Sequence, residues 1–261
     1  MPAQASSPLP AQRAATARGA IVTAAGPRMS AVLHELALPT FTAYARAWGW
    51  EVLSEDLGQD GAGADPSAQQ AKWTKIRLLR AALETHAFAL WLDADVLLLR
   101  TDDDILGHLR PGDFQALALE QVPTEHRVNP NTGVWLLRSC PEAFAFLDAV
   151  ETTGRQPGPW ADQGAVLAAL GWDRGDADYR WARPGLGNVH TAGTSWLPVG
   201  WNAPFLEGRS GEDCFNSGAD SYADRPTVDR PHALHFMGMT PAARYGAMAA
   251  VAGRPTVVPA A

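Results

Sequence analysis

The stretch FALWLDADVLLLR, residues 88–100, places two aspartates, Asp93 and Asp95, within an apolar run. Aspartate is depleted from strands, and an unpaired buried carboxylate costs so much free energy that it normally takes up a proton. If the strand covers only residues 88–92, both aspartates lie at its exit. Residues two apart in extended chain point the same way, about 6.6 Å apart along the strand. The two carboxylates can therefore converge on one hard cation such as Mg²⁺ or Mn²⁺.

The segments before this stretch alternate between strand and helix patterns. Residues 19–26 form a short apolar run, residues 29–50 suit a helix interrupted near Pro39, and residues 51–57 alternate like a strand. Residues 68–86 have a strongly helical pattern. The order strand, helix, strand, helix, strand predicts an α/β domain with parallel pairing and right-handed crossovers. Ligands of such sheets gather beyond the carboxyl ends of the strands, where the two aspartates are expected.

Charge and composition exclude several classes of protein. The formal net charge of -7 argues against a general nucleic-acid binder, because phosphate backbones need a basic face. No segment approaches the roughly 18 uninterrupted apolar residues of a membrane helix, and the N-terminus lacks the apolar core of a signal peptide. We therefore expect a soluble, cytoplasmic protein without a membrane span. Neither a dinucleotide-binding glycine motif nor a P-loop is present, so a bound diphosphate would be held by metal and side chains.

Other interpretations of the acidic residues can be tested against the same stretch. A calcium loop starting at Asp93 fails, because its sixth position would be Leu98 instead of glycine. Residues 102–104, all aspartate, precede a short helix and are expected to cap it. An aspartate-nucleophile phosphatase also places two aspartates, two apart, after an apolar strand. Those enzymes place the pair after their first strand and have a downstream cationic residue, usually lysine. Here the pair follows the third expected strand, and no lysine follows it.

Three later motifs combine polar residues with regular patterns: residues 127–140 (RVNPNTGVWLLRSC), 160–170 (WADQGAVLAAL) and 231–239 (PHALHFMGM). The first predicts a polar loop followed by a strand. The second opens a helix with Asp162 and Gln163 in its first turn, where capping alone would explain the aspartate. The third predicts a short strand with His235 at its close and Gly238 just after. A lone histidine is more often structural, yet neutral imidazole commonly joins carboxylates around Mn²⁺.

The order of these motifs resembles that of GT-A-fold glycosyltransferases: LDAD (92–95), NTG (131–133), DQ (162–163), LPVGWN (197–202) and HFMG (235–238). The nearest likeness is to the α-1,2-galactosyltransferase and α-1,6-mannosyltransferase family, followed by the glycogenin-like family. The resemblance covers residues 19–245 and implies one α/β domain with a mixed, mostly parallel central sheet flanked by helices. Residues 1–18, rich in Ala, Pro, Ser and Gln, are expected to be a flexible N-terminal tail, and residues 246–261 a C-terminal tail.

The resemblance also implies an activity. A metal-dependent, retaining hexosyltransferase would move a hexose from a nucleotide-diphosphate sugar, such as UDP-galactose, UDP-glucose or GDP-mannose, to a saccharide or other hydroxyl acceptor. Asp93 and Asp95 match the DxD motif that binds Mn²⁺ or Mg²⁺ and the donor, and His235 matches the histidine that completes the metal site. Asp162 and Gln163 match catalytic positions lining the sugar pocket, where Asp162 would either stabilise the sugar cation or attack it. Further matches to donor-binding positions are Thr23, Lys75, Asn131 and Gly238.

The sequence departs from the family pattern in two places. Glycogenin-like enzymes carry a lysine-proline pair shortly after the last histidine motif, whereas residues 239–246 offer only Arg244. Many galactosyl and mannosyl members carry an N-terminal membrane anchor, and none is seen here. A catalytically silent nucleotide-sugar-binding module remains an alternative to the enzyme. Indole rings suit sugar acceptors, and five candidates lie in the C-terminal half: Trp160, Trp172, Trp181, Trp196 and Trp201.

Overall fold

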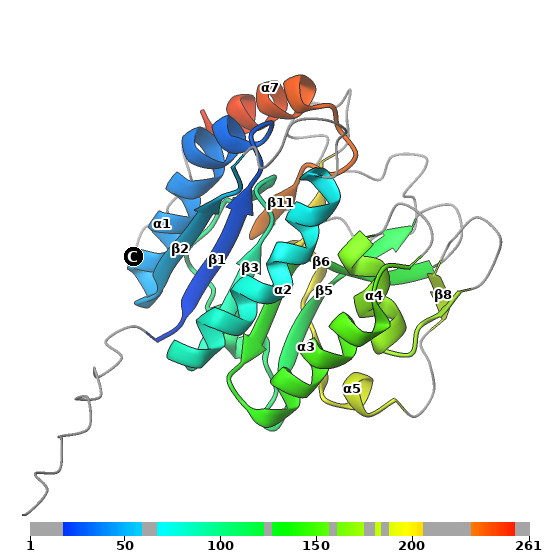
Figure 1. The fold of residues 1–261 in the computed structure, drawn as a ribbon. Coiled ribbons are helices and arrows are strands. Elements are labelled where there is room, and N and C mark those ends of the chain that lie inside the picture. The colour runs from blue at the N-terminus through cyan, green and yellow to red at the C-terminus, as the bar shows by residue number, and fades with distance from the viewer. Residues whose placement is uncertain are drawn as a thin grey trace, which may run out of the picture.

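The main sheet of the computed structural model has the strand order β2-β1-β3-β6-β5-β9 (Figure 1). The structure describes residues 18–58, 67–122, 127–156, 161–174, 181–183, 188–205 and 231–253. The strands are β1 (Ala20–Ala25), β2 (Glu51–Asp56), β3 (Phe88–Leu92), β5 (Gln115–Val122), β6 (Arg127–Arg138) and β9 (Thr194–Trp196). Pairings β1–β2, β1–β3 and β5–β9 are parallel, and β3–β6 and β5–β6 are antiparallel. The expected α/β fold with a mixed, mostly parallel sheet is confirmed.

Helices cover both faces of this sheet, which explains why β1 and β3 are almost wholly apolar. Alternate residues of each strand point to opposite faces. Ile21 and Leu90 pack in one buried cluster with η1 and α1, whereas Val22 and Trp91 pack in a second cluster with α2, α3 and α4. Figure 1 shows α2, α3 and α4 lying across one face. The helix bounds are η1 (Val32–Ala37), α1 (Leu38–Trp48), α2 (Ser67–Thr85), α3 (Pro141–Thr153), α4 (Ala161–Ala169) and α5 (Val189–Ala192).

A small sheet at the carboxyl end of β3 has the order β10-β11-β4. Its strands are β10 (Ala203–Pro204), β11 (Ala233–His235) and β4 (Val96–Leu98). Because β11 is antiparallel to β4, His235 lies opposite Val96, the residue that follows the two aspartates. A further pair, β7 (Asp173–Arg174) with β8 (Trp181–Arg183), forms a separate two-stranded sheet. The small sheet therefore places His235 next to the residues that follow β3.

The helix expected to break near Pro39 changes type there instead. The π-helix η1 passes directly into α1, and Pro39 is the second residue of α1. Pro39 therefore lies where the helical hydrogen-bonding pattern changes and does not end the helix. Gly49 then ends α1 in the left-handed conformation, with φ of 71°.

The expected polar loop at the start of residues 127–140 is a strand, so that prediction was wrong. β6 runs without interruption from Arg127 to Arg138 and pairs with β5 on both sides of the NTG motif. The register shifts where Leu117 pairs with Trp135 while the next residue, Ala118, pairs with Asn131. Residues 132–134 therefore bulge out of the β5 ladder. Bulges re-aim side chains next to active sites, and this one lies beside the exit of β3.

Only one of the three aspartates at 102–104 caps the following helix η2 (Ile105–His108). Asp104 accepts a hydrogen bond from the Leu106 backbone nitrogen at 3.1 Å. Asp102 instead pairs with Arg100 at 2.5 Å. The capping prediction therefore holds for Asp104 alone.

The expected boundary after residue 245 lies within helix α7 (Pro241–Ala252). Met248 and Val251 of this helix are buried in the same cluster as Leu33 of η1. Burial of these apolar side chains stabilises the packing of α7 on the rest of the fold, which therefore extends to Ala252. Residues 1–17 and 254–261 lie outside the described part. Among the helices that are described, none combines the length and apolarity required to cross a bilayer.

Candidate active site

Three backbone hydrogen bonds assemble the site around the turn between β3 and β4. The Asp93 nitrogen donates to the Gly133 carbonyl at 2.9 Å, which ties the exit of β3 to the bulge of β6. Within the turn, the Val96 nitrogen donates to the Asp93 carbonyl at 3.0 Å. The Phe236 nitrogen donates to the Asp95 carbonyl at 2.9 Å, which ties the turn to the end of β11. Both aspartates are thus held outside the strands, as the sequence predicts.

The side chains of Asp93, Asp95 and His235 converge. The His235 Nε2 atom lies 3.3 Å from Asp95 Oδ1 and 3.9 Å from Asp93 Oδ2. One ligand atom from each of the three residues lies within 4.8 Å of the others. Two carboxylates and an imidazole suit Mn²⁺ and also accept Mg²⁺. The three residues singled out as metal ligands therefore form a donor set that fits such an ion.

Lys75 lies beneath this cluster and joins two carboxylates from different elements. Its Nζ atom is 3.1 Å from Asp93 Oδ1 and 2.9 Å from Asp162 Oδ2. It also donates to the backbone carbonyl and hydroxyl oxygens of Thr132, each at 3.1 Å. Burial would lower the pKa of Lys75, but the carboxylates of Asp162 and Asp93 outweigh burial and raise that pKa. The ammonium is therefore a buried, charged link between α2, β3 and α4.

Asp93 is held in its ionised form by the same contacts. Burial would raise the pKa of Asp93, but the positive charge of Lys75 lowers it, as does a 2.5 Å hydrogen bond from Trp91 Nε1. Lys75 also lies 5.2 Å from the Trp91 ring centroid, within the range of a cation–π contact. These contacts supply the compensation that a carboxylate at the end of a buried strand requires.

Asp162 and Gln163 differ in their surroundings. Asp162 is only 4% exposed, and it accepts hydrogen bonds from Lys75 and from the Thr132 hydroxyl at 3.2 Å. Gln163 lines the cleft described below, and its buried Nε2 atom has no hydrogen-bond partner within the described residues. Gln163, and not Asp162, is therefore the member of the pair that lines the cleft.

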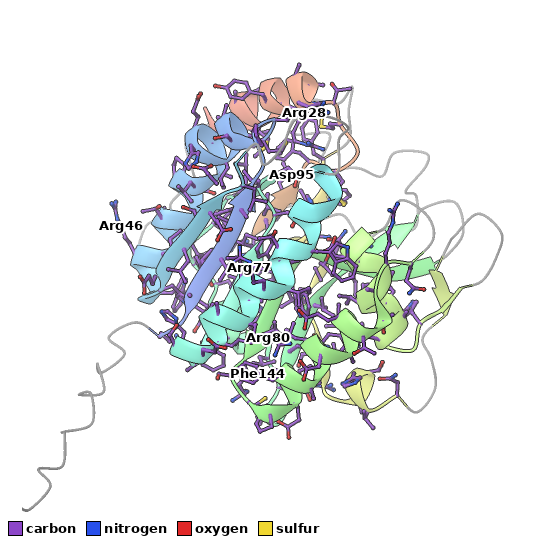
Figure 2. All side chains as sticks on the ribbon, in the orientation of Figure 1. Arg28, Arg46, Arg77, Arg80, Asp95 and Phe144 are labelled. Carbon is purple, nitrogen blue, oxygen red and sulfur yellow. The ribbon has the colours of Figure 1, made fainter. Side chains whose placement is uncertain are left out.

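A cleft of about 430 Å³ opens above the metal-ligand cluster. This volume lies in the range of small-molecule sites. Figure 2 shows Arg28 and Asp95 at the same end of the sheet, close to α7, and both line the cleft. Among the donor-binding predictions, Lys75, Asn131 and Gly238 also line it. Gly238 has a φ of 71°, which favours glycine at this wall.

Thr23 does not line this cleft. Its side chain is wholly buried within β1, and its Oγ1 atom has no hydrogen-bond partner in the described chain. The cleft is lined instead by the next residues, 24–29, which follow β1. The donor-binding role expected of Thr23 therefore has no geometric support.

Arg244 reaches the cleft from α7. Its Nε atom lies 3.2 Å from Asp95 Oδ2 and donates to the Phe236 carbonyl at 2.9 Å. Its Nη1 atom lies 3.1 Å from Met29 Sδ. The sequence indicates Arg244 only as the residue present where relatives have a lysine. Its contact with Asp95 could not be predicted, because nothing in the local pattern places α7 against residue 95.

The candidate acceptor tryptophans give little support to stacking on a sugar. Trp172 and Trp201 are buried, and Trp196 packs against Trp172 with ring centroids 5.7 Å apart. The side chains of Trp160 and Trp181 lie outside the described residues.

Comparison with known proteins gives two sequence relatives that match part of the chain. No family model matches the chain. Two rice proteins (Oryza sativa subsp. indica and japonica), each named probable glycosyltransferase 7, are 32% identical over 108 residues. This match covers 39% of the chain and only 24% of those relatives.

Solved structures of similar fold cover most of the chain. A glycosyltransferase involved in glycosylation of the major capsid of PBCV-1 has a TM-score of 0.57 at 15% identity, covering 88% of this chain and 98% of that one. The galactosyltransferase LgtC with donor and acceptor sugar analogues has a TM-score of 0.50 at 15% identity, covering 92% and 97%. At these identities the likeness establishes the fold alone. The chain therefore has the GT-A fold seen in glycosyltransferases.

Proposed function

We propose that this protein is a metal-dependent glycosyltransferase. It would transfer a hexose, with retention of configuration, from a nucleotide-diphosphate sugar to a saccharide or other hydroxyl acceptor. The observation that carries the proposal is the convergence of Asp93, Asp95 and His235 on one point of a cleft at the carboxyl end of β3. In open α/β sheets this is where ligands bind. The GT-A fold supports the same activity.

Asp93, Asp95 and His235 would hold Mn²⁺ or Mg²⁺. When bound, the ion supplies positive charge that stabilises the departing nucleoside diphosphate. Arg28 and Arg244 line the same cleft in a chain of net charge -7. We assign them to the diphosphate, because guanidinium groups donate paired hydrogen bonds to phosphate oxygens. Gly238, at the same wall, would let the phosphates approach the backbone.

The contacts of Asp162 favour one of the two roles left open by the sequence. Lys75 and Thr132 both donate to this carboxylate, and its side chain does not line the cleft. A carboxylate engaged in this way is a poor nucleophile, but it fixes negative charge behind the reacting sugar, where positive charge develops. Gln163 is then the member of the pair that contacts the donor sugar. The acceptor hydroxyl would attack from the face of the departing phosphate, which takes its proton.

The fold does not favour the phosphatase alternative. Aspartate-nucleophile phosphatases place their pair after the first strand, whereas Asp93 and Asp95 follow the third strand in the chain, β3. The binding module remains a distinct outcome of experiment, because it would bind the donor without turning it over.

A thermal-shift screen with UDP-galactose, UDP-glucose and GDP-mannose, each with and without Mn²⁺, tests the proposal. A ligand that binds the folded state alone raises the unfolding temperature. We expect stabilisation by one donor that depends on Mn²⁺, followed by release of the nucleoside diphosphate in a turnover assay. Stabilisation without turnover for any donor or acceptor would indicate the binding module. Absence of stabilisation by every donor, together with no turnover, would reject the glycosyltransferase.

A further inference from the structure

The imidazole of His235 contacts Asn202 and lies close to Gly133, two residues that are not themselves proposed metal ligands. Asn202 follows the short helix η4 (Val199–Trp201) and is 2% exposed. Its Oδ1 atom lies 2.9 Å from His235 Nδ1. Gly133, in the bulge of β6, lies close to the Cε1 and Nδ1 atoms of the ring. Both residues belong to motifs noted in the sequence, LPVGWN and NTG, but the pattern gave neither a role.

The contact with Asn202 defines which ring nitrogen carries the proton. An amide oxygen can only accept a hydrogen bond, so Nδ1 of His235 must donate. The Nε2 atom of the neutral ring then presents a lone pair towards Asp95 Oδ1, 3.3 Å away, and Asp93 Oδ2, 3.9 Å away. A lone pair facing two carboxylates is the arrangement that a shared cation stabilises.

This orientation of the Asn202 amide leaves its Nδ2 donor unsatisfied in the described part of the chain. Its Nδ2 atom is buried and has no hydrogen-bond partner among the described residues. Reversing the amide would place Nδ2 against His235 Nδ1 and move the ring proton to Nε2. That alternative would direct an N–H group, not a lone pair, at the carboxylates, and it makes the assignment testable.

Gly133 provides the space in which the ring lies. A Cβ atom added to Gly133 would lie 2.3 Å from His235 Cε1 and 2.8 Å from its Nδ1. It would also lie 2.9 Å from Asn131 Oδ1. The φ angle of Gly133 is not in the left-handed region, so the need is for space and not for backbone freedom. Any side chain here must displace the imidazole or the Asn131 amide.

We propose that Asn202 and Gly133 are positioning residues for the metal centre. Asn202 selects the His235 tautomer with the proton on Nδ1, and Gly133 sets how closely the ring approaches β6. Together they direct Nε2 to the point shared with Asp93 and Asp95. The inference rests on the proposed function, in which these three residues hold a divalent cation.

Mn²⁺ titration of the full chain, followed by electron paramagnetic resonance, tests the role of Asn202. Asn202→Leu keeps the branched shape but removes the acceptor, and we expect Mn²⁺ affinity to fall about 10- to 100-fold. Asn202→Asp keeps an acceptor for Nδ1–H and should bind Mn²⁺ within a few-fold of wild type. Wild-type affinity in Asn202→Leu, or equal losses in two variants that both remain folded by circular dichroism, would overturn the proposal.

The tautomer can be observed without metal. In ¹⁵N-histidine-labelled protein in alkaline buffer, two-bond ¹H–¹⁵N correlations distinguish the neutral tautomers, and a His235→Gln sample assigns the signal. We expect Nδ1–H in wild type and loss of that preference in Asn202→Leu. Nε2–H in wild type would overturn the assignment. If wild type shows Nδ1–H but binds no Mn²⁺, the proposed function fails while the tautomer assignment stands.

A double-mutant cycle tests Gly133. Gly133→Ala should lower the unfolding temperature of the metal-free protein, because the new methyl group meets the imidazole. In a His235→Ala background most of that loss should disappear, since only the Asn131 contact remains. Equal losses in both backgrounds would show that the ring is not what Gly133 accommodates.

Discussion

Lys75 Nζ lies 2.9 Å from Asp162 Oδ2, and this ion pair connects the middle of α2 to the first turn of α4. The same ammonium is 3.1 Å from Asp93 Oδ1 at the exit of β3. The Lys75 ammonium therefore contacts both the candidate metal centre and the first turn of α4, which carries the candidate catalytic residues. The resemblance implied that Lys75 reaches the donor, but in the structure its three hydrogens face Asp93, Asp162 and Thr132.

Replacing Lys75 with methionine should destabilise the protein strongly. The change leaves the Asp93 and Asp162 carboxylates without their shared partner, and breaking a buried pair costs about 3–5 kcal/mol. Urea unfolding of the metal-free protein measures the loss. Arg77→Met on the same helix is the matched control, because Arg77 pairs with Glu55 at the surface and an exposed pair contributes about 0–1 kcal/mol. Similar losses in the two variants would contradict a buried linking role for Lys75.

Asp95→Asn should abolish turnover and leave the fold intact. The substitution removes a negative charge from the metal-ligand set while keeping the shape of the side chain. We expect kcat/KM to fall by about 10³-fold or more, which corresponds to about 4 kcal/mol. Asp148→Asn, an exposed aspartate on α3 that pairs with Arg80, is the control and should retain activity. Unchanged turnover in Asp95→Asn would remove the basis for the metal-dependent reaction.

Arg244→Met should weaken binding of the nucleoside diphosphate. The variant loses a guanidinium that lines the cleft and holds Asp95 Oδ2, and a charge-assisted hydrogen bond contributes about 1.5–3 kcal/mol. We expect about 10- to 100-fold weaker binding of UDP or GDP with Mn²⁺, measured by isothermal titration calorimetry. Arg46→Met removes the same charge from α1, where Figure 2 shows the side chain pointing away from the protein. Equal effects of the two variants would indicate a general charge effect and not a site at Arg244.

The Tyr44 phenol should make the protein sensitive to alkali. Burial raises the pKa of Tyr44 above its ordinary value of 10.0, although the hydrogen bond from Ile105 opposes the shift. Because the folded state favours the neutral phenol, this contribution to stability is fully present below pH 10 and is lost as pH rises above it.

Urea unfolding at increasing pH tests this, with Tyr44→Phe as the comparison. The free energy of unfolding of wild type should fall more steeply above pH 10.0 than that of Tyr44→Phe, which has no phenol at this position. Parallel pH curves for the two proteins would show that Tyr44 does not titrate with unfolding.

Local patterns determined several elements of this protein before any tertiary contact was considered. The apolar run 88–92 ends where Asp93 begins, and the 68–86 helix appears as α2. His235 closes a short strand, as its flanking residues indicate. Each of these depends on hydrophobic period and on residues a few positions apart, which a sequence displays directly.

Tertiary structure decided the rest. The NTG segment looked like a loop because polar residues disfavour strands, but β5 pairs with β6 on either side of residues 132–134, which makes the segment a bulge within a strand. Asn202, Gly133 and His235 are far apart in the chain, and the pairing of β11 with β10 and β4 brings the ring beside Asn202 and the bulge. Arg244 and Asp95 are likewise far apart in the chain, and the packing of α7 brings them together. Contacts between distant residues depend on how sheets and helices pack, and hydrophobic period sets the face of an element but not its neighbour.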